Sequence, residues 1–207
     1  MVSAEIVERV LKGDKRWIAR LISQIEDGVS GVEEVLAKLH PYTGKSYIVG
    51  VTGPPGVGKS CLINELIKFY RRKDKQVSAI LIDPSSPISG GAFLGDRIRV
   101  QEHSTDPKVF IRSMGTRGWT GGLAEKTGDI IKVLEASGSD IIFVETVGTG
   151  QNEIEVTHLA DTVIVVVAPM LGDDIQAIKA GIFELSLIHI SEPTRPLYIS
   201  YAVFCLK

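Results

Sequence analysis

Apolar side chains recur every three or four residues along the first part of the chain, with Lys, Arg and Glu between them. The positions that follow this spacing are Ile6, Val10, Leu11, Ile18, Leu21, Ile22 and Ile25. This period places the apolar positions on one face of a helix, so we predict helix over residues 1–39. Two Gly-containing pairs, at residues 27–28 and 30–31, interrupt the pattern. A second apolar run of the same period consists of Val32, Val35, Leu36 and Leu39. Residues 1–44 are therefore expected to form a helical N-terminal extension.

From Lys45 onward, short β-branched apolar runs alternate with segments of helical period. The predicted strands are Tyr47–Val51, Val77–Ile82, Val109–Ile111, Asp140–Val144 and Thr162–Val167. The predicted helices are Ser60–Arg72, Gly122–Ala136 and Asp173–Leu185. Nearly continuous apolar strands separated by helices are typical of a parallel sheet that is covered on both faces. The sequence thus predicts an α/β domain over residues 45–185, with a mainly parallel sheet flanked by helices.

The last 22 residues depart from this alternation. They contain no Gly and no Asp, whereas residues 1–185 contain all 21 glycines of the chain. Pro193 and Pro196 interrupt the place where the next strand is expected. Residues 186–207 are therefore interpreted as a doubtful tail that does not belong to the domain.

Composition narrows the class of protein. The chain has 23 Lys and Arg against 25 Asp and Glu, a net charge of −2, which argues against a surface built to bind nucleic acid or a membrane. Its longest apolar stretch, residues 163–171, is far shorter than the ~20 residues of a membrane span. The N-terminus lacks a signal-peptide core, so a cytoplasmic location is expected. Two cysteines, Cys61 and Cys205, make neither a disulfide framework nor a zinc site.

A stretch between the first strand and the first helix of the α/β region matches the phosphate-loop pattern G-x-x-x-x-G-K-[ST]. It consists of Gly53, Pro54, Pro55, Gly56, Val57, Gly58, Lys59 and Ser60. The glycines let backbone N–H groups turn toward phosphates, and the N-terminus of the next helix adds positive charge. Lys59 is expected between the β- and γ-phosphates, and the Ser60 hydroxyl suits Mg²⁺. Cys61 is interpreted as a packing or backbone contact in the first helical turn. A structural glycine turn is the alternative interpretation of the whole stretch.

Two acids follow predicted strands at the edge where such a loop would lie, and a third closes a loop that starts there. Glu145 ends a buried apolar strand, as the metal-binding acid of nucleotide hydrolases does, and Gly148 is expected to bring a backbone N–H to the γ-phosphate. Asp83 directly follows another strand and is a second candidate for holding metal-bound water. Asp96 closes the glycine-rich stretch after Asp83, which could equally be a mobile switch or an ordinary loop.

At these positions the sequence resembles the MeaB/ArgK-type GTPases, relatives of the methylmalonic aciduria type A protein. The matching stretches, in the order of the family, are GPPGVGKS, LIDPSSPISGGAFLGDRIRV, FIRSMGTRGWTGGLA, FVETVGTGQNE and GDDIQAIKAGIFEL. With the helical N-terminus they cover about residues 1–185.

The resemblance implies a P-loop GTPase that binds GTP and Mg²⁺ and acts as a chaperone of an adenosylcobalamin-dependent methylmalonyl-CoA mutase, gating cofactor loading and protecting the mutase. It implies that Lys59 and Ser60 are the residues for phosphate and Mg²⁺. It also implies that Asp83, Asp96 and Glu145 lie near the metal and the attacking water. Residues 172–181 would correspond to a switch that touches the mutase; their residue types alone also fit a helix cap and a solvated face. No water-orienting residue is evident. The arginines that could act as a finger are Arg97, Arg99, Arg112 and Arg117. We expect slow turnover that a partner accelerates.

The sequence departs from the family after residue 185. The family continues into a strand ending in Asn-Lys-x-Asp, which reads guanine, and this motif is absent from the chain. The segment SLIHISEPTRPL instead resembles a translated sequencing adapter, so residues 186–207 are hypothesised to be non-native; a divergent C-terminus is the alternative. Guanine specificity therefore rests on the resemblance alone. The region through which the family forms homodimers is also expected to be missing.

Three other classes share parts of this pattern. An ATP-dependent kinase or transport ATPase would carry the same phosphate loop. A nickel-delivery GTPase would need clustered ligands, whereas His40, His103 and His158 are scattered. An inert nucleotide-binding fragment is the third, because the base-reading strand is missing.

Overall fold

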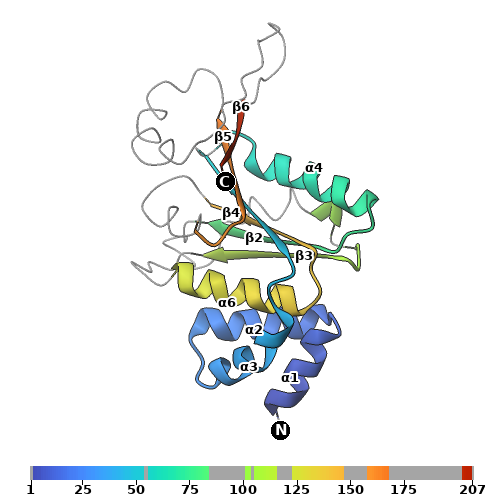
Figure 1. Cartoon of the computed structure of the whole chain (residues 1–207), viewed down its shortest axis with the longest axis vertical. Coiled ribbons are helices and arrows are strands. Elements are labelled where there is room, and N and C mark those ends of the chain that lie inside the picture. The colour runs from blue at the N-terminus through green and yellow to red at the C-terminus, as the bar shows by residue number, and fades with distance from the viewer. Residues whose placement is uncertain are drawn as a thin grey trace, which may run out of the picture.

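A sheet of six strands organises the molecule, in the order β3-β2-β4-β1-β5-β6 (Figure 1). Its strands are β1 (Tyr47–Thr52), β2 (Val77–Asp83), β3 (Val109–Gly115), β4 (Ile141–Glu145), β5 (Thr162–Val167) and β6 (Ala202–Leu206). The computed structural model describes residues 2–53, 56–83, 101–103, 105–115, 123–146, 158–167 and 202–206.

Strands β1 to β5 pair with one another in parallel, which confirms the predicted fold class. Their carboxyl ends therefore meet at one edge of the sheet, as expected for an α/β domain. The observed bounds follow the predicted ones closely; β3 is longer, because it continues to Gly115 where the prediction stopped at Ile111. Strand β6 lies within the segment interpreted as a doubtful tail and pairs antiparallel with β5. The non-native origin of that segment remains a prediction.

Helix α4 (Lys59–Arg72) covers one face of the sheet. Its residues Ile63 and Ile67 are fully buried against side chains that alternate along the strands, such as Ala79 and Leu81 of β2 and Phe143 of β4. This alternation is the period of two that a pleated strand imposes, so each strand contributes to both faces.

The opposite face is covered by helix α6 (Leu123–Ala136), with three further helices packed beneath it (Figure 1). These are α1 (Val2–Leu11), α2 (Lys15–Asp27) and α3 (Val32–Leu39), followed by the short 3-10 helix η1 (His40–Tyr42). Their buried apolar residues form one continuous cluster with α6 and with Ile80, Ile142 and Val144 of the sheet. The helical N-terminus is thus packed into the same core as the sheet.

The first predicted helix is divided in the structure. Gly13 adopts a φ of 72°, and Asp14 caps α2 by accepting a hydrogen bond from the backbone N–H of Arg16 at 3.0 Å. A Gly followed by Asp is a common helix stop and start, so the signal was present in the sequence. The prediction of one helix up to residue 27 was wrong at this point. The helix predicted over residues 173–185 lies outside the described residues.

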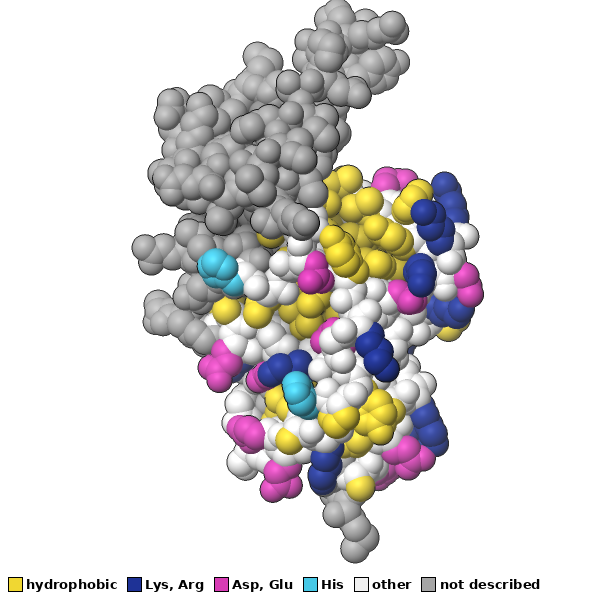
Figure 2. Space-filling model, viewed as in Figure 1, with side chains coloured by type: hydrophobic (Ala, Val, Ile, Leu, Met, Phe, Trp, Pro, Cys, Tyr) yellow, Lys and Arg dark blue, Asp and Glu magenta, His cyan; other side chains and the backbone are white. Residues whose placement is uncertain are grey.

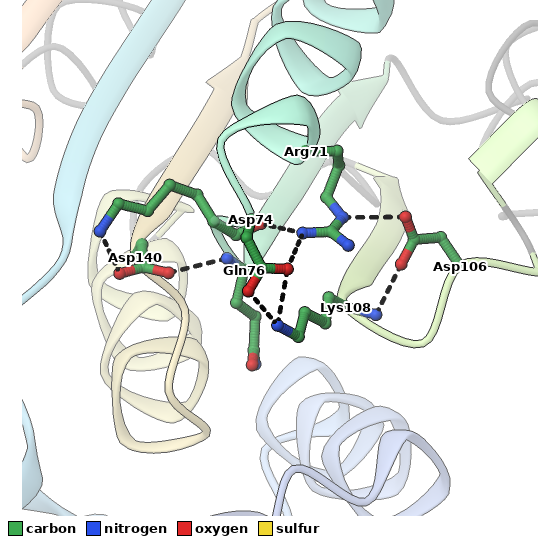
Figure 3. Close-up of polar contacts among 7 residues, drawn as sticks. Arg71, Asp74, Gln76, Asp106, Lys108 and Asp140 are labelled. Carbon is green, nitrogen blue, oxygen red and sulfur yellow. Dashed lines mark hydrogen bonds and ion pairs between the residues drawn. The ribbon is translucent and has the colours of Figure 1, made fainter.

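The amino edge of the sheet is held by a network of charged side chains (Figure 3). Arg71, in the last turn of α4, donates from Nε to Asp106 Oδ2 at 2.8 Å. Lys108 pairs with Asp74 at 2.8 Å, and Asp140 accepts from the Gln76 backbone N–H at 2.7 Å. These contacts join α4, the start of β2 and the start of β3 at the edge opposite the phosphate loop.

Charged side chains of both signs are spread over the described surface shown in Figure 2, with no extended basic tract. This agrees with the near-neutral net charge. No helix among the described residues is long and apolar enough to cross a membrane. The cytoplasmic location remains a prediction.

Candidate functional site

The predicted phosphate loop connects β1 to α4 at the carboxyl edge of the sheet. Gly56 and Gly58 have φ values of 80° and 97°, and Gly58 is the N-cap residue of α4. Because glycine has no side chain to cap a helix, the first N–H groups of α4 keep their donors for another acceptor. A phosphate at a helix N-terminus is such an acceptor.

Gly53 shows why the loop must begin with glycine. Its φ is 141°, and a Cβ placed there would lie 2.0 Å from the carbonyl oxygen of Val166 in β5. The loop therefore starts in close contact with the end of the neighbouring strand. Only a residue without a side chain permits this approach.

Lys59 is the first residue of α4, and its side chain is buried with 6% exposure. Its Nζ donates a hydrogen bond to the Gly53 carbonyl oxygen at 2.8 Å, across the mouth of the loop. The ammonium group is thus held beside the backbone that would surround phosphates. This is the position in which a lysine can neutralise β- and γ-phosphate charge.

Ser60 and Glu145 meet in the interior. The Ser60 hydroxyl donates to Glu145 Oε1 at 2.9 Å, and the two residues are 6% and 8% exposed. Register explains the meeting, because β4 lies beside β1 with Glu145 opposite Val51, one residue before the end of β1. A hydroxyl and a carboxylate oxygen are ligands of the kind that Mg²⁺ takes together with substrate phosphates and water. These residues therefore fit an Mg²⁺ ion.

For most of the other predicted site residues, the structure does not describe the side chain. Asp83 is the last residue of β2 at the same edge, but its side chain lies outside the described part, as do Pro54, Pro55, Asp96 and Gly148. Val57 is buried in the core beneath α4. Cys61 is exposed, so the packing role considered for it is wrong, while the backbone contact stays a prediction. Among the described residues no group of three or more His, Cys, Asp or Glu could hold a metal ion.

Arg112, one of the arginines considered as a finger, has a different contact. Its Nη2 donates to Glu26 Oε2 of α2 at 2.5 Å and to the Ser23 hydroxyl at 3.0 Å. Glu26 is 6% exposed, which sequence reasoning missed. The burial of Glu26 could have been predicted from its place beside Ile22 and Ile25 on the apolar face of the helix. Arg112 thus joins the N-terminal helices to β3.

Comparison with known proteins decides between the families that share a phosphate loop. The sequence model described as methylmalonyl Co-A mutase-associated GTPase MeaB matches residues 18–192. The chain belongs to this family. A protein of Pyrococcus abyssi named as a GTPase is 56% identical, with 90% of this chain and 57% of that protein covered. The GTPase ArgK of Escherichia coli is 34% identical over 88% of this chain and 56% of its own length.

Two further similar proteins extend the comparison. The mitochondrial methylmalonic aciduria type A homolog of Mus musculus is 37% identical over 83% of this chain and 41% of its own length. The crystal structure of an LAO/AO transport system kinase superposes with a TM-score of 0.61 at 27% identity, covering 79% of this chain and 49% of that one. The resemblance and the P-loop fold are thereby confirmed. The chain spans about half the length of the relatives that it matches.

Proposed function

We propose that this MeaB-family chain binds GTP with Mg²⁺ and hydrolyses the bond between the β- and γ-phosphates. The observation that carries the proposal is the assembly of Lys59, Ser60 and Glu145 at the carboxyl edge of the sheet, with Lys59 Nζ and the Ser60–Glu145 pair both buried. Charge-neutralising and metal-binding groups in this arrangement suit phosphoryl transfer, which depends on positioning and electrostatic stabilisation.

Each residue has a role in this scheme. Lys59 would bind the β- and γ-phosphates, while the loop amides and the start of α4 surround them. Ser60 and Glu145, with Asp83 through water, would hold Mg²⁺, which neutralises charge on the departing phosphate. Asp96 and Glu145 are proposed to orient the attacking water, and Gly148 to contact the γ-phosphate. Burial strengthens these interactions because the local dielectric is low.

The partner we propose is an adenosylcobalamin-dependent mutase of the methylmalonyl-CoA mutase type. The description of the family and the name of the methylmalonic aciduria type A relative support it. The chain would gate loading of the cofactor and protect the mutase, with GTP hydrolysis as the switch. In this proposal, residues 172–181 touch the mutase.

Nucleotide binding tests the first part. Fluorescent mant-GTP and mant-ATP would be titrated with Mg²⁺ into the wild-type chain and into Lys59→Ala. We expect GTP to bind and Lys59→Ala to weaken it by about 10- to 100-fold, the worth of a hydrogen bond to a charged group. Lys68→Ala is the matched control, since Lys68 lies on the same helix, is only partly buried and pairs with Glu65 and Glu102. A preference for ATP would favour a kinase or ATPase, and no binding would favour an inert fragment.

Single-turnover hydrolysis of GTP, with and without a purified methylmalonyl-CoA mutase, tests the second part. We expect a slow intrinsic rate that rises when the mutase is added. Equal rates in both reactions would contradict the chaperone role and leave the GTPase proposal standing.

A further inference from the structure

Helix α4 carries two different stripes of side chains along its length. One stripe is polar and consists of Asn64, Lys68 and Arg71. It holds the segment from Glu102 to Asp106 against the helix, through contacts of 2.8 Å from Lys68 to Glu102 and from Arg71 to Asp106. Asn64 adds a longer hydrogen bond to Glu102, of 3.4 Å. This side of α4 is therefore occupied by the chain itself.

The second stripe of α4 is apolar and faces solvent. It consists of Leu62, Leu66 and Phe69, whose spacing of four and three residues places them on one side of the helix. Phe69 is 47% exposed, and Leu62 and Leu66 are only partly buried against the core. Figure 2 shows hydrophobic side chains gathered over α4. Exposed apolar residues that lie together, rather than singly, mark an interaction surface.

Two opposite charges lie along the solvent edge of this apolar stripe. Glu65 and Arg72 are both exposed and stand seven residues, or about two helical turns, apart. The midpoint of this charged pair falls within one residue of the midpoint between Leu66 and Phe69. If two α4 helices pack antiparallel, Leu66 therefore faces Phe69 of the second copy, and Glu65 faces Arg72 of the second copy. A parallel pair would instead place Glu65 beside Glu65, which is unfavourable.

We propose that the apolar stripe of α4 is an interface between two copies of this chain, which pack antiparallel about a two-fold axis. The occupant is a second copy because the stripe is complementary to itself in both apolar character and charge. A two-fold axis makes each favourable contact twice. The interface is separate from the region through which the family forms homodimers, which is expected to be missing. It requires no nucleotide, so it does not depend on the proposed function.

Sedimentation equilibrium of the wild-type chain at micromolar concentrations measures the association directly, in the range suited to a small interface. We expect a mass of about twice the 22.4 kDa of one chain. Phe69→Glu should give the mass of a single chain, because it places a charge in the apolar contact. The variant should remain folded by circular dichroism, since Phe69 is half exposed and Lys73 lies beside it to pair with the new carboxylate. A monomeric wild type would overturn the inference and leave the stripe to a different protein.

Charge reversal tests the antiparallel packing. Glu65→Arg and Arg72→Glu should each raise the dissociation constant of the dimer about tenfold, because each brings like charges together at two symmetric positions. The double variant should return to within about threefold of the wild type, because the pairs form again with their signs exchanged. A double variant that associates as weakly as the single variants would overturn the proposed packing.

Glu8→Arg on α1 is the matched control for these reversals. Glu8 is exposed and pairs with Lys12 of its own helix, as Glu65 pairs with Lys68. Its reversal changes the net charge by the same amount on a different helix. The dissociation constant should therefore stay at the wild-type value, and an increase equal to that of Glu65→Arg would contradict a specific role for α4.

Discussion

The phosphate loop begins at a residue whose backbone and surroundings both require glycine. Gly53 has a positive φ, and its neighbour Val166 leaves no room for a Cβ. Its carbonyl oxygen also accepts the hydrogen bond from Lys59. Gly53 thus contacts both the end of β5 and Lys59, the lysine that we propose to bind phosphate.

Gly53→Ala should lower the free energy of unfolding by about 3 kcal/mol, because the new Cβ adds a severe contact to the strain of a positive φ. Gly28→Ala is the matched control: Gly28 also has a positive φ, of 65°, but nothing lies within 4 Å of its added Cβ. That variant should lose only about 1–2 kcal/mol. Urea unfolding of both measures the difference. Equal losses would show that the contact with Val166 is not decisive.

At the scale of elements, charged side chains join helix α2 to the sheet. Glu26 of α2 and Arg112 of β3 form an ion pair in which Glu26 is almost wholly buried. Lys126 of α6 donates to the Glu26 carbonyl oxygen at 2.8 Å, so three elements meet at one residue. A buried ion pair favours the one packing of helix on sheet in which both charges are paired, even where apolar residues would stabilise the protein equally well.

Removal of one member of this pair should leave a buried charge without compensation. We expect Arg112→Met to lose about 3 kcal/mol of unfolding free energy, because it leaves the buried Glu26 carboxylate unpaired, and Glu26→Leu to lose about 2 kcal/mol, because the Arg112 left behind is partly exposed. The double variant should lose less than the sum of the two. Chemical denaturation of all three gives the coupling energy. Simple additivity would show that the pair does not couple α2 to β3.

Asp106, before β3, joins α4 to α2. The hydrogen bond from Arg71 is the main cause that lowers the pKa of Asp106, with a smaller contribution from the Lys108 backbone N–H. Lys15 of α2 donates to the Asp106 carbonyl oxygen at 2.6 Å. A carboxyl with a lowered folded pKa stabilises the protein above its unfolded pKa, and this stabilisation is lost as pH falls through the folded value.

The pH profile of Asp106→Asn should therefore be flatter than that of the wild type. At about pH 7 the variant should be less stable by roughly 1 kcal/mol, because the charged hydrogen bond is lost. The difference should begin to shrink as the pH falls below about 4, where the carboxyl of the unfolded chain becomes protonated, and should disappear below the lowered pKa of the folded state. Urea titrations across this range test it. A difference that stays constant down to about pH 2 would contradict the assignment.

At the scale of the whole molecule, the N-terminal helices and the sheet share one apolar cluster. Residues of α1, α2 and α3 pack on α6, and α6 packs on the sheet. A shared core predicts that these parts unfold together, because neither surface would remain covered alone. The N-terminal helices would then be a structural part of the nucleotide-binding unit.

Trp17 of α2 reports on this prediction. In Trp119→Phe, the remaining tryptophan emission comes from the N-terminal helices alone, while far-UV circular dichroism reports on all elements. We expect the two signals to give the same denaturation midpoint. An earlier change in Trp17 emission would show that the extension unfolds on its own.

The order of elements and the phosphate loop could be predicted from the sequence because their signals are local. Apolar runs, helical periods and the glycines of residues 53–58 depend on near neighbours in the chain, so they identify strands, helices and a turn directly. The break at Gly13 and Asp14 was equally local and was missed only because the apolar period continues across it. The acid Glu145 was identified by the same kind of signal, an apolar strand that ends in a carboxylate.

The contacts between distant residues were decided by the tertiary structure. No pattern of spacing reveals that β4 lies beside β1 and brings Glu145 to Ser60, 85 positions earlier in the chain. Nor does it show that Arg112 is bound by Glu26. By itself the sequence determined which elements form and where phosphate chemistry is placed, because those are properties of short segments. Which side chains meet depends on strand order and register, and these arise only when the whole sheet packs.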